Sequence, residues 1–225
     1  MGESPTSLLR LLQLTSPALP VGAYAYSQGL EYAIQAGWVN DESSARDWIG
    51  GILEHALTQL DGPVLLRLLS AWEEQDPERV RYWNRFILAS RESRELQQED
   101  AHLGQALARL LNDLGMTKAG PFIREQKAAF VTLFSLAVVR WQVSAADALQ
   151  GYLWSWTENQ VAAAIKLVPL GQTAGQRMLL ALGERIPRFA GRAAEVGDDD
   201  IGQITQGLAM ASAWHETQYS RLFRS

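Results

Sequence analysis

The chain has 225 residues, of which 47% are hydrophobic and 20% are charged, and this composition excludes a disordered or low-complexity polymer. Lys and Arg number 20 against 25 Asp and Glu, so the formal net charge of −5 does not favour binding to nucleic acid or to anionic lipid. No cysteine is present, which excludes disulfides, cysteine-based zinc sites and thiol nucleophiles.

The N-terminal segment MGESPTSLLRLLQL does not have the pattern of a secretory signal. Glu3 stands in place of a basic region, and Arg10 interrupts the apolar part. The strongest apolar stretch, AAFVTLFSLAVV at 128–139, is shorter than the ~18 residues that a membrane-spanning helix needs. We therefore expect a cytoplasmic protein that does not bind membranes, and in which residues 128–139 form a buried helix.

The segment SPALPVGAYAYSQGLEYAIQAGWV, at 16–39, combines features that helix propensity alone does not explain. Two prolines stiffen its entry, and glycines allow close approach of the backbone. Its tyrosines offer an apolar ring with a hydroxyl group that seeks a hydrogen-bond partner. Such a segment forms either a kinked junction inside the fold or a docking surface for another protein.

The next helix start is marked by three adjacent residues. Asp76 offers an N-cap oxygen, Pro77 suits the first helical position, and Glu78 lies near the positive end of the helix dipole. We expect one long helix from this start to about Gln98. Beyond it, leucines within 103–114 recur at helical spacing and form a stripe that faces a core.

A further helix start lies at Ser144, which resembles a capping box with Asp147. This helix is expected to run to about Leu167. Pro169 and Gly171 then end it.

Strands are not expected, because apolar and polar residues nowhere alternate over more than a few positions. No internal repeat or abrupt change in composition divides the chain. The sequence therefore predicts an all-α, single-domain helical bundle over residues 1–225, with roughly seven to ten helices.

The chain has few groups suited to catalysis or metal binding. Three histidines, no cysteine and four methionines are a poor ligand set, and P-loop and zinc-protease patterns are incomplete. Glu99 and His102 form a single Glu-x-x-His element, whereas di-iron bundles need two. The favoured interpretation is a solvated helix face on which Arg91 and Glu95 form an ion pair. We expect no catalytic, cofactor-binding or metal-binding residue; the alternative is a helical metal- or small-molecule-binding enzyme using carboxylates near Glu99 and His102.

The last residues, HETQYSRLFRS at 215–225, are rich in aromatic and arginine side chains, although chain ends usually drift toward polar residues. Such a terminus is suited to being tied down. It binds either the body of its own chain or a partner protein.

Four segments together resemble the UreF family of urease accessory proteins. They are LLQLTSPALPVGAYAYSQGLEYAIQAGWV, RESRELQQEDAHLGQALARLL, AAAIKLVPLGQTAGQRML and HETQYSRLFRS, and they span nearly the whole chain in the family's order. Trp214 is a departure, since a basic residue is expected just before the His-Glu pair.

The resemblance implies an all-helical, non-catalytic protein that forms a homodimer and takes part in assembling the nickel centre of urease. The implied partners are the UreD (also called UreH) scaffold, the UreG GTPase and apo-urease. In the family the UreF dimer lies between UreD and UreG and recruits UreG. Proposed family roles are control of GTP hydrolysis and passage of nickel.

The resemblance also indicates candidate residues for tail anchoring or partner binding. Tyr24 and Arg221 are expected to form a pair that pins the tail, residues 212–225, to the body, and the ordered tail then completes a surface for UreG. Glu31 and Lys166 are charges in apolar neighbourhoods, which mark either an internal ion pair or a partner contact. The remaining candidates come from the terminal motif: His215, Glu216, Tyr219, Phe223 and Arg224.

Overall fold

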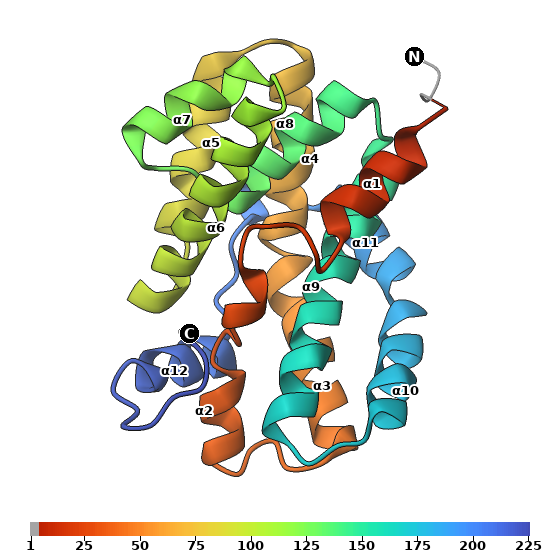
Figure 1. Cartoon of the computed structure of the whole chain (residues 1–225), viewed down its shortest axis with the longest axis vertical. Coiled ribbons are helices and arrows are strands. Elements are labelled where there is room, and N and C mark those ends of the chain that lie inside the picture. The colour runs from red at the N-terminus through yellow and green to blue at the C-terminus, as the bar shows by residue number, and fades with distance from the viewer. Residues whose placement is uncertain (1–4) are drawn as a thin grey trace.

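The computed structural model describes residues 5–225, and within that range it contains helices and no strand (Figure 1). The all-α prediction is confirmed, but the described chain has twelve α-helices where roughly seven to ten were expected. They are α1 (Ser7–Thr15), α2 (Leu30–Gln35), α3 (Glu42–Ile52), α4 (Asp61–Glu73), α5 (Pro77–Ala89), α6 (Arg94–Asp113), α7 (Gly120–Glu125), α8 (Phe130–Trp141), α9 (Ala145–Leu167), α10 (Gln172–Gly183), α11 (Ile186–Glu195) and α12 (Gln206–His215). Short helical turns connect them: η1 (Ala23–Ala25), η2 (Leu53–Leu57), η3 (Thr117–Ala119) and η4 (Asp198–Asp200).

The helices form two groups that share a core. Helices α4 to α8 gather at one end of the molecule, and α3, α9 and α10 run side by side toward the other end (Figure 1). Helix α8 packs against both α4 and α6, and all its residues from 131 to 138 are buried. The predicted buried helix is therefore confirmed, although it spans Phe130–Trp141 where 128–139 was expected. Within residues 5–225, no helix combines the length and hydrophobicity needed to cross a membrane.

Two predicted helix starts have the expected caps. The Asp76 carboxylate accepts hydrogen bonds from the backbone N–H groups of Glu78 and Arg79, each at 3.0 Å, at the start of α5. The Ser144 hydroxyl accepts one from the backbone N–H of Asp147 at 3.1 Å. Helix α9 then runs to Leu167, as the sequence predicts.

The prediction of a single long helix from residue 77 to about Gln98 is wrong. Helix α5 ends at Ala89, and α6 begins at Arg94 with Ser93 as its N-cap. The Ser93 hydroxyl accepts a hydrogen bond from the backbone N–H of Leu96 at 3.1 Å, which starts a new helix. The intervening turn brings the Arg91 side chain into the interior, so a tertiary contact decides where the helices break.

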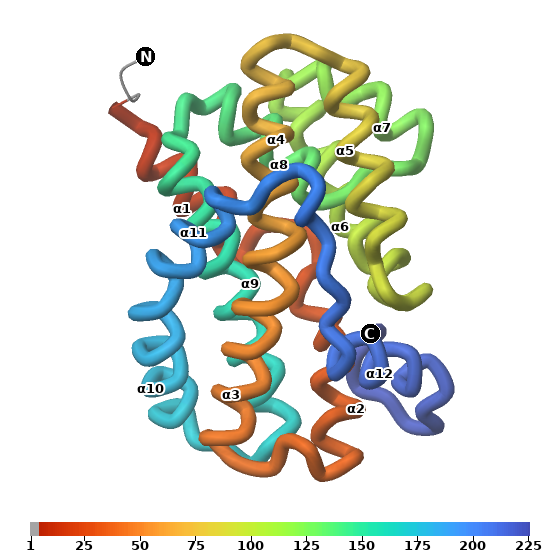
Figure 2. Tube along the Cα trace, turned by 180° about the vertical axis from the view of Figure 1, so that it is seen from behind, coloured from red at the N-terminus to blue at the C-terminus, as the bar shows by residue number. Residues whose placement is uncertain are grey.

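The chain end returns to the middle of the molecule. Figure 2 shows the connection after α11 running along the back of the fold to α12, and the C-terminus lying beside α12. Helix α12 packs against α2, where Gly29 has a φ of +77°. A Cβ added at Gly29 would lie 2.9 Å from the backbone nitrogen of Ser212, so only glycine permits this approach. Segment 16–39 thus contains a tight internal junction.

Candidate functional site

The candidate site is the place where the C-terminal tail, residues 216–225, docks on the body of the chain. Residues 212–215 of the segment expected as tail instead form the last turn of α12. The tail folds back between α2 and α6, so segments from both ends of the sequence meet there (Figures 1 and 2). We call this the tail-docking site and define it by the body residues that hold the tail: Ser27, Glu31, Glu95, Glu99 and His215.

Glu31, in the first turn of α2, is the main acceptor for the tail backbone. Its Oε1 accepts a hydrogen bond from the backbone N–H of Leu222 at 2.6 Å, and its Oε2 accepts one from Phe223 at 2.8 Å. Glu31 is only 8% exposed. A buried carboxylate that accepts two backbone N–H groups holds the direction of the tail as well as its position.

His215 and Glu95 form the second anchor. The His215 ring is 0% exposed and places Nδ1 2.6 Å from Glu95 Oε2 and Nε2 3.3 Å from Glu31 Oε2. The Arg221 guanidinium donates to Glu95 Oε1 at 2.6 Å. His215 therefore links the two carboxylates that hold the tail.

The last residue forms the third anchor. The Ser225 carbonyl oxygen accepts hydrogen bonds from the Ser27 hydroxyl at 2.6 Å and the Ser27 backbone N–H at 2.9 Å. The Ser225 hydroxyl is hydrogen-bonded to Glu99 Oε2 at 2.6 Å, and Gln28 Nε2 donates to Glu99 Oε1 at 2.7 Å. Burial raises the pKa of Glu99 to about 7, although the hydrogen bonds from Ser225 and Gln28 act to lower it.

The apolar side chain of Phe223 also holds the tail on the body. Phe223 is buried, and the Lys166 Nζ lies 5.8 Å from the centre of its ring. Lys166 and Glu31, two charges whose roles the sequence left open, therefore both contact the tail. For Glu31 the contacts in this chain are internal.

The prediction that Tyr24 and Arg221 pair with each other is wrong. Arg221 binds Glu95, and Tyr24, in η1, is 70% exposed. Glu95 was instead expected to pair with Arg91 on a solvated face. It was missed as an anchor because its real partners lie more than 100 residues away along the chain.

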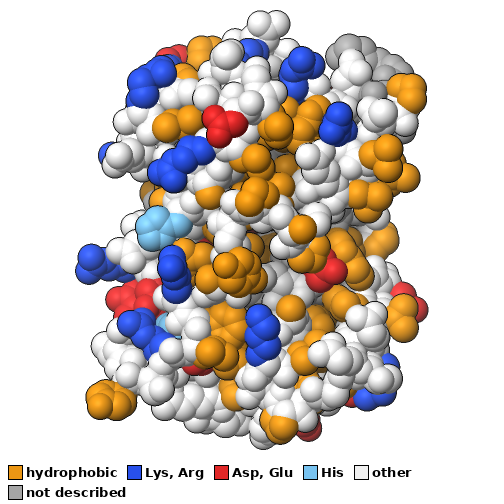
Figure 3. All heavy atoms as spheres, viewed as in Figure 1, with side chains coloured by type: hydrophobic (Ala, Val, Ile, Leu, Met, Phe, Trp, Pro, Cys, Tyr) orange, Lys and Arg blue, Asp and Glu red, His pale blue; other side chains and the backbone are white. Residues whose placement is uncertain are grey.

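The other residues of the terminal motif divide between the body and solvent. The Glu216 carboxylate accepts from the backbone N–H groups of Arg94 and Glu95, so it binds the first turn of α6. The Arg224 backbone N–H donates to the Ala25 carbonyl at 2.9 Å. Tyr219 is fully exposed and points away from the body. Figure 3 shows acidic and basic side chains gathered on this side of the molecule, over α6 and α12.

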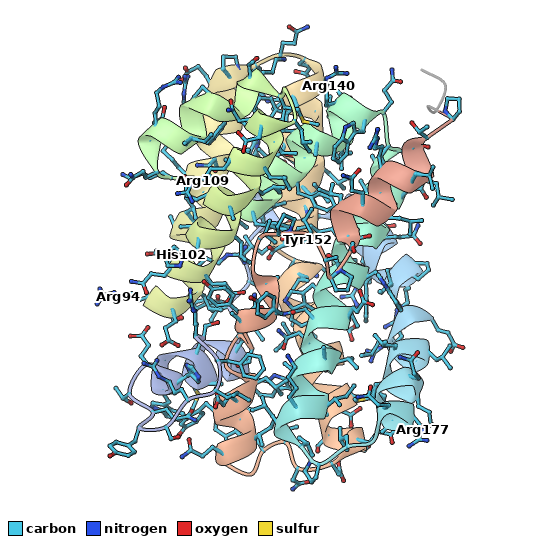
Figure 4. All side chains as sticks on the ribbon, viewed as in Figure 1. Arg94, His102, Arg109, Arg140, Tyr152 and Arg177 are labelled. Atoms are coloured by element: carbon cyan, nitrogen blue, oxygen red, sulfur yellow. The ribbon has the colours of Figure 1, made fainter. Side chains whose placement is uncertain are left out.

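An ionic cluster lies in the interior next to the site. Arg91 forms ion pairs with Asp61 and Asp100, both at 2.8 Å. The hydroxyl of Tyr152, which Figure 4 labels in the interior, donates to Asp61 at 2.9 Å. Burial alone would lower the pKa of Arg91, but the two carboxylates outweigh it and hold that pKa well above its ordinary value. For Tyr152 burial acts in the opposite direction: it raises the pKa of the hydroxyl, and the negative charge of Asp61 raises it further. Arg91 is thus a core residue and not a surface residue.

A cavity of about 200 Å³ extends from this cluster toward the tail-docking site, under residues 14–28 and between α6 and α9. Three carboxyl groups whose pKa is raised by burial line it: Glu92, Glu99 and Glu158. Tyr24 lies on its wall.

The Glu99 and His102 element does not converge on a shared ligand. Glu99 binds Ser225 and Gln28, whereas His102, on the outer side of α6, has its Nδ1 3.3 Å from the Tyr26 hydroxyl (Figure 4). Glu99 is 3% exposed, so the expectation of a solvated face is wrong at this position. Among residues 5–225, no group of three or more His, Cys, Asp or Glu side chains is placed to hold a metal ion.

Comparison with known proteins gives one consistent family. Residues 39–183 match the family model described as UreF. A urease accessory protein UreF from Alkalilimnicola ehrlichii is 52% identical over 216 residues, which cover 96% of this chain and 95% of that protein. Urease accessory proteins UreF from Teredinibacter turnerae (51% identical, covering 97% of this chain and 98% of that protein) and Hahella chejuensis (48%, 98% and 99%) are also similar.

Proposed function

Because the chain belongs to the UreF family of urease accessory proteins, we propose that it is a non-catalytic subunit in the assembly of the urease nickel centre. It forms a homodimer in the cytoplasm and links the UreD (UreH) protein to the UreG GTPase on apo-urease. It recruits UreG and modulates GTP hydrolysis and nickel delivery. Nickel is the cargo of this complex and not a cofactor of the chain.

The observation that carries this proposal is the docked tail. Hydrogen bonds to Glu31 and Ser27 fix its backbone, and Arg221 binds Glu95 through its side chain, yet the Tyr219 and Leu222 side chains remain largely exposed. An ordered segment that presents an aromatic and an aliphatic side chain to solvent loses little conformational entropy when a partner covers it. The docked tail thus supports the proposal that the tail completes a surface to which UreG binds.

The test is size-exclusion chromatography with light scattering on the chain mixed with UreD, UreG, GTP and nickel. The wild type is expected to form a complex that contains UreG. Arg221→Ala removes the side-chain anchor to Glu95 and is expected to reduce that complex. Arg81→Ala, which removes an exposed ion pair on α5, is the matched control. An unchanged UreG complex with Arg221→Ala would refute the role of the tail, and a chain indifferent to both partners would refute the proposed function.

A further inference from the structure

A proton-binding group, Glu99, lies under the docked tail. It is buried between α6, segment 14–28 and the last residue of the tail. Its contacts, the Ser225 hydroxyl and the Gln28 amide, are both uncharged. Two charged groups act on it through the interior: Arg91, which is already bound to two other carboxylates, and Asp100, whose negative charge opposes ionisation of Glu99. A docked tail therefore disfavours the ionised form of Glu99.

The neutral form of Glu99 keeps both hydrogen bonds. Its Oε1 accepts from Gln28 Nε2 as before, and the protonated Oε2 donates to the Ser225 Oγ, which can act as donor or acceptor. The Gln28 carbonyl oxygen is occupied by the indole N–H of Trp156 at 2.7 Å, so the orientation of the Gln28 amide is fixed. Protonated Glu99 therefore satisfies all its neighbours without a buried charge.

The other charged groups under the tail lie around His215, which faces a carboxylate with each ring nitrogen. Glu95 approaches from α6 and Glu31 from α2, while Arg221 binds Glu95 from the tail.

We propose that the C-terminal tail is a proton-controlled latch, which closes on the body when Glu99 is protonated and loosens as the pH rises. This inference rests on the proposed function, because it assigns a regulation to the surface that the tail completes. Glu99 binds its proton more tightly when the tail is docked, because docking buries its carboxyl group.

The pKa of Glu99 sets the pH range. With the tail docked the carboxyl titrates at about 7, and with the tail released it is exposed and returns toward its ordinary value of 4.5. A group whose pKa is raised in the docked state favours docking at low pH, and this contribution is lost as the pH rises through about 7. Between pH 6 and pH 8 the docking equilibrium is expected to weaken about tenfold from Glu99 alone.

The experiment uses the full chain with one added spin label. Because the chain has no cysteine, Tyr219→Cys gives a single attachment point on an exposed tail position. Electron paramagnetic resonance then measures the ratio of mobile to immobile label from pH 6 to pH 8. The ratio is expected to rise about tenfold for the otherwise unchanged chain.

Two variants in the labelled background separate this latch from a general effect of pH. Glu99→Gln imitates the protonated carboxyl and is expected to keep the tail docked and to remove most of the pH dependence. Glu158→Gln changes another carboxyl of raised pKa that lines the same cavity, and it is expected to retain the full dependence.

A mobile fraction that stays constant from pH 6 to pH 8 would overturn the latch. So would a Glu99→Gln variant that retains the full pH dependence. Neither result touches the proposed function, since the label reports on the isolated chain. Conversely, a working latch in a chain that binds neither UreD nor UreG would refute the proposed function and leave the latch intact.

Discussion

Glu31→Gln tests the main anchor of the tail with almost no change in side-chain shape. The carboxylate offers two acceptor oxygens, which bind the backbone N–H groups of Leu222 and Phe223. The amide offers a single acceptor oxygen, so at least one tail N–H loses its partner and His215 loses a negative neighbour. A hydrogen bond to a charged group contributes about 1.5–3 kcal/mol, so docking is expected to weaken by roughly 3 kcal/mol.

Amide hydrogen exchange read by NMR at pH 6 measures this loss at the two residues concerned. A weakening of roughly 3 kcal/mol corresponds to exchange about a hundredfold faster at Leu222 and Phe223, while core amides of α8 keep their protection. Glu73→Gln, on the exposed surface of α4, is the matched control and is expected to change neither. If Leu222 and Phe223 in Glu31→Gln exchange within threefold of wild type, the assignment of Glu31 as the main anchor is wrong.

Two further predictions follow from the core and from the exposed tail. Arg91→Met leaves two buried carboxylates without a cation, so the free energy of unfolding is expected to fall by roughly 3–5 kcal/mol. In a thermal scan by circular dichroism the midpoint is then expected roughly 10 °C lower. An unchanged midpoint would show that the ionic cluster is dispensable. Tyr219→Ala removes a fully exposed ring, so stability is expected to stay within about 0.5 kcal/mol. In a UreG pull-down the same variant is expected to bind more weakly, and equal binding would place the contact elsewhere.

The sequence predicts the fold class and the helix starts that depend on local chemistry. Asp76 and Ser144 were identifiable because a cap bonds to the backbone two or three residues away. The break between α5 and α6 was not identifiable. It depends on Arg91 reaching Asp61, which lies 30 residues earlier in the chain.

The sequence predicted that the C-terminal segment binds the body of the chain or a partner, but it did not predict the contacts. The guanidinium of Arg221 meets Glu95, a residue whose local spacing indicated a surface ion pair. The role of Glu31 was left open between an ion pair and a partner contact, because its main donors are backbone N–H groups that no side-chain pattern reveals. Ser27 was missed for the same reason, since it binds the carbonyl oxygen of Ser225.

The most direct test of the central claim, that the docked tail completes the surface for UreG, is a UreG pull-down with UreD present at pH 6. Wild type, Glu31→Gln and the control Glu73→Gln would be compared at equal concentration, with circular dichroism to show that all three are folded. Wild type and Glu73→Gln are expected to retain UreG, and Glu31→Gln is expected to lose it. Equal retention of UreG by a folded Glu31→Gln chain whose tail is undocked would contradict the role of the tail.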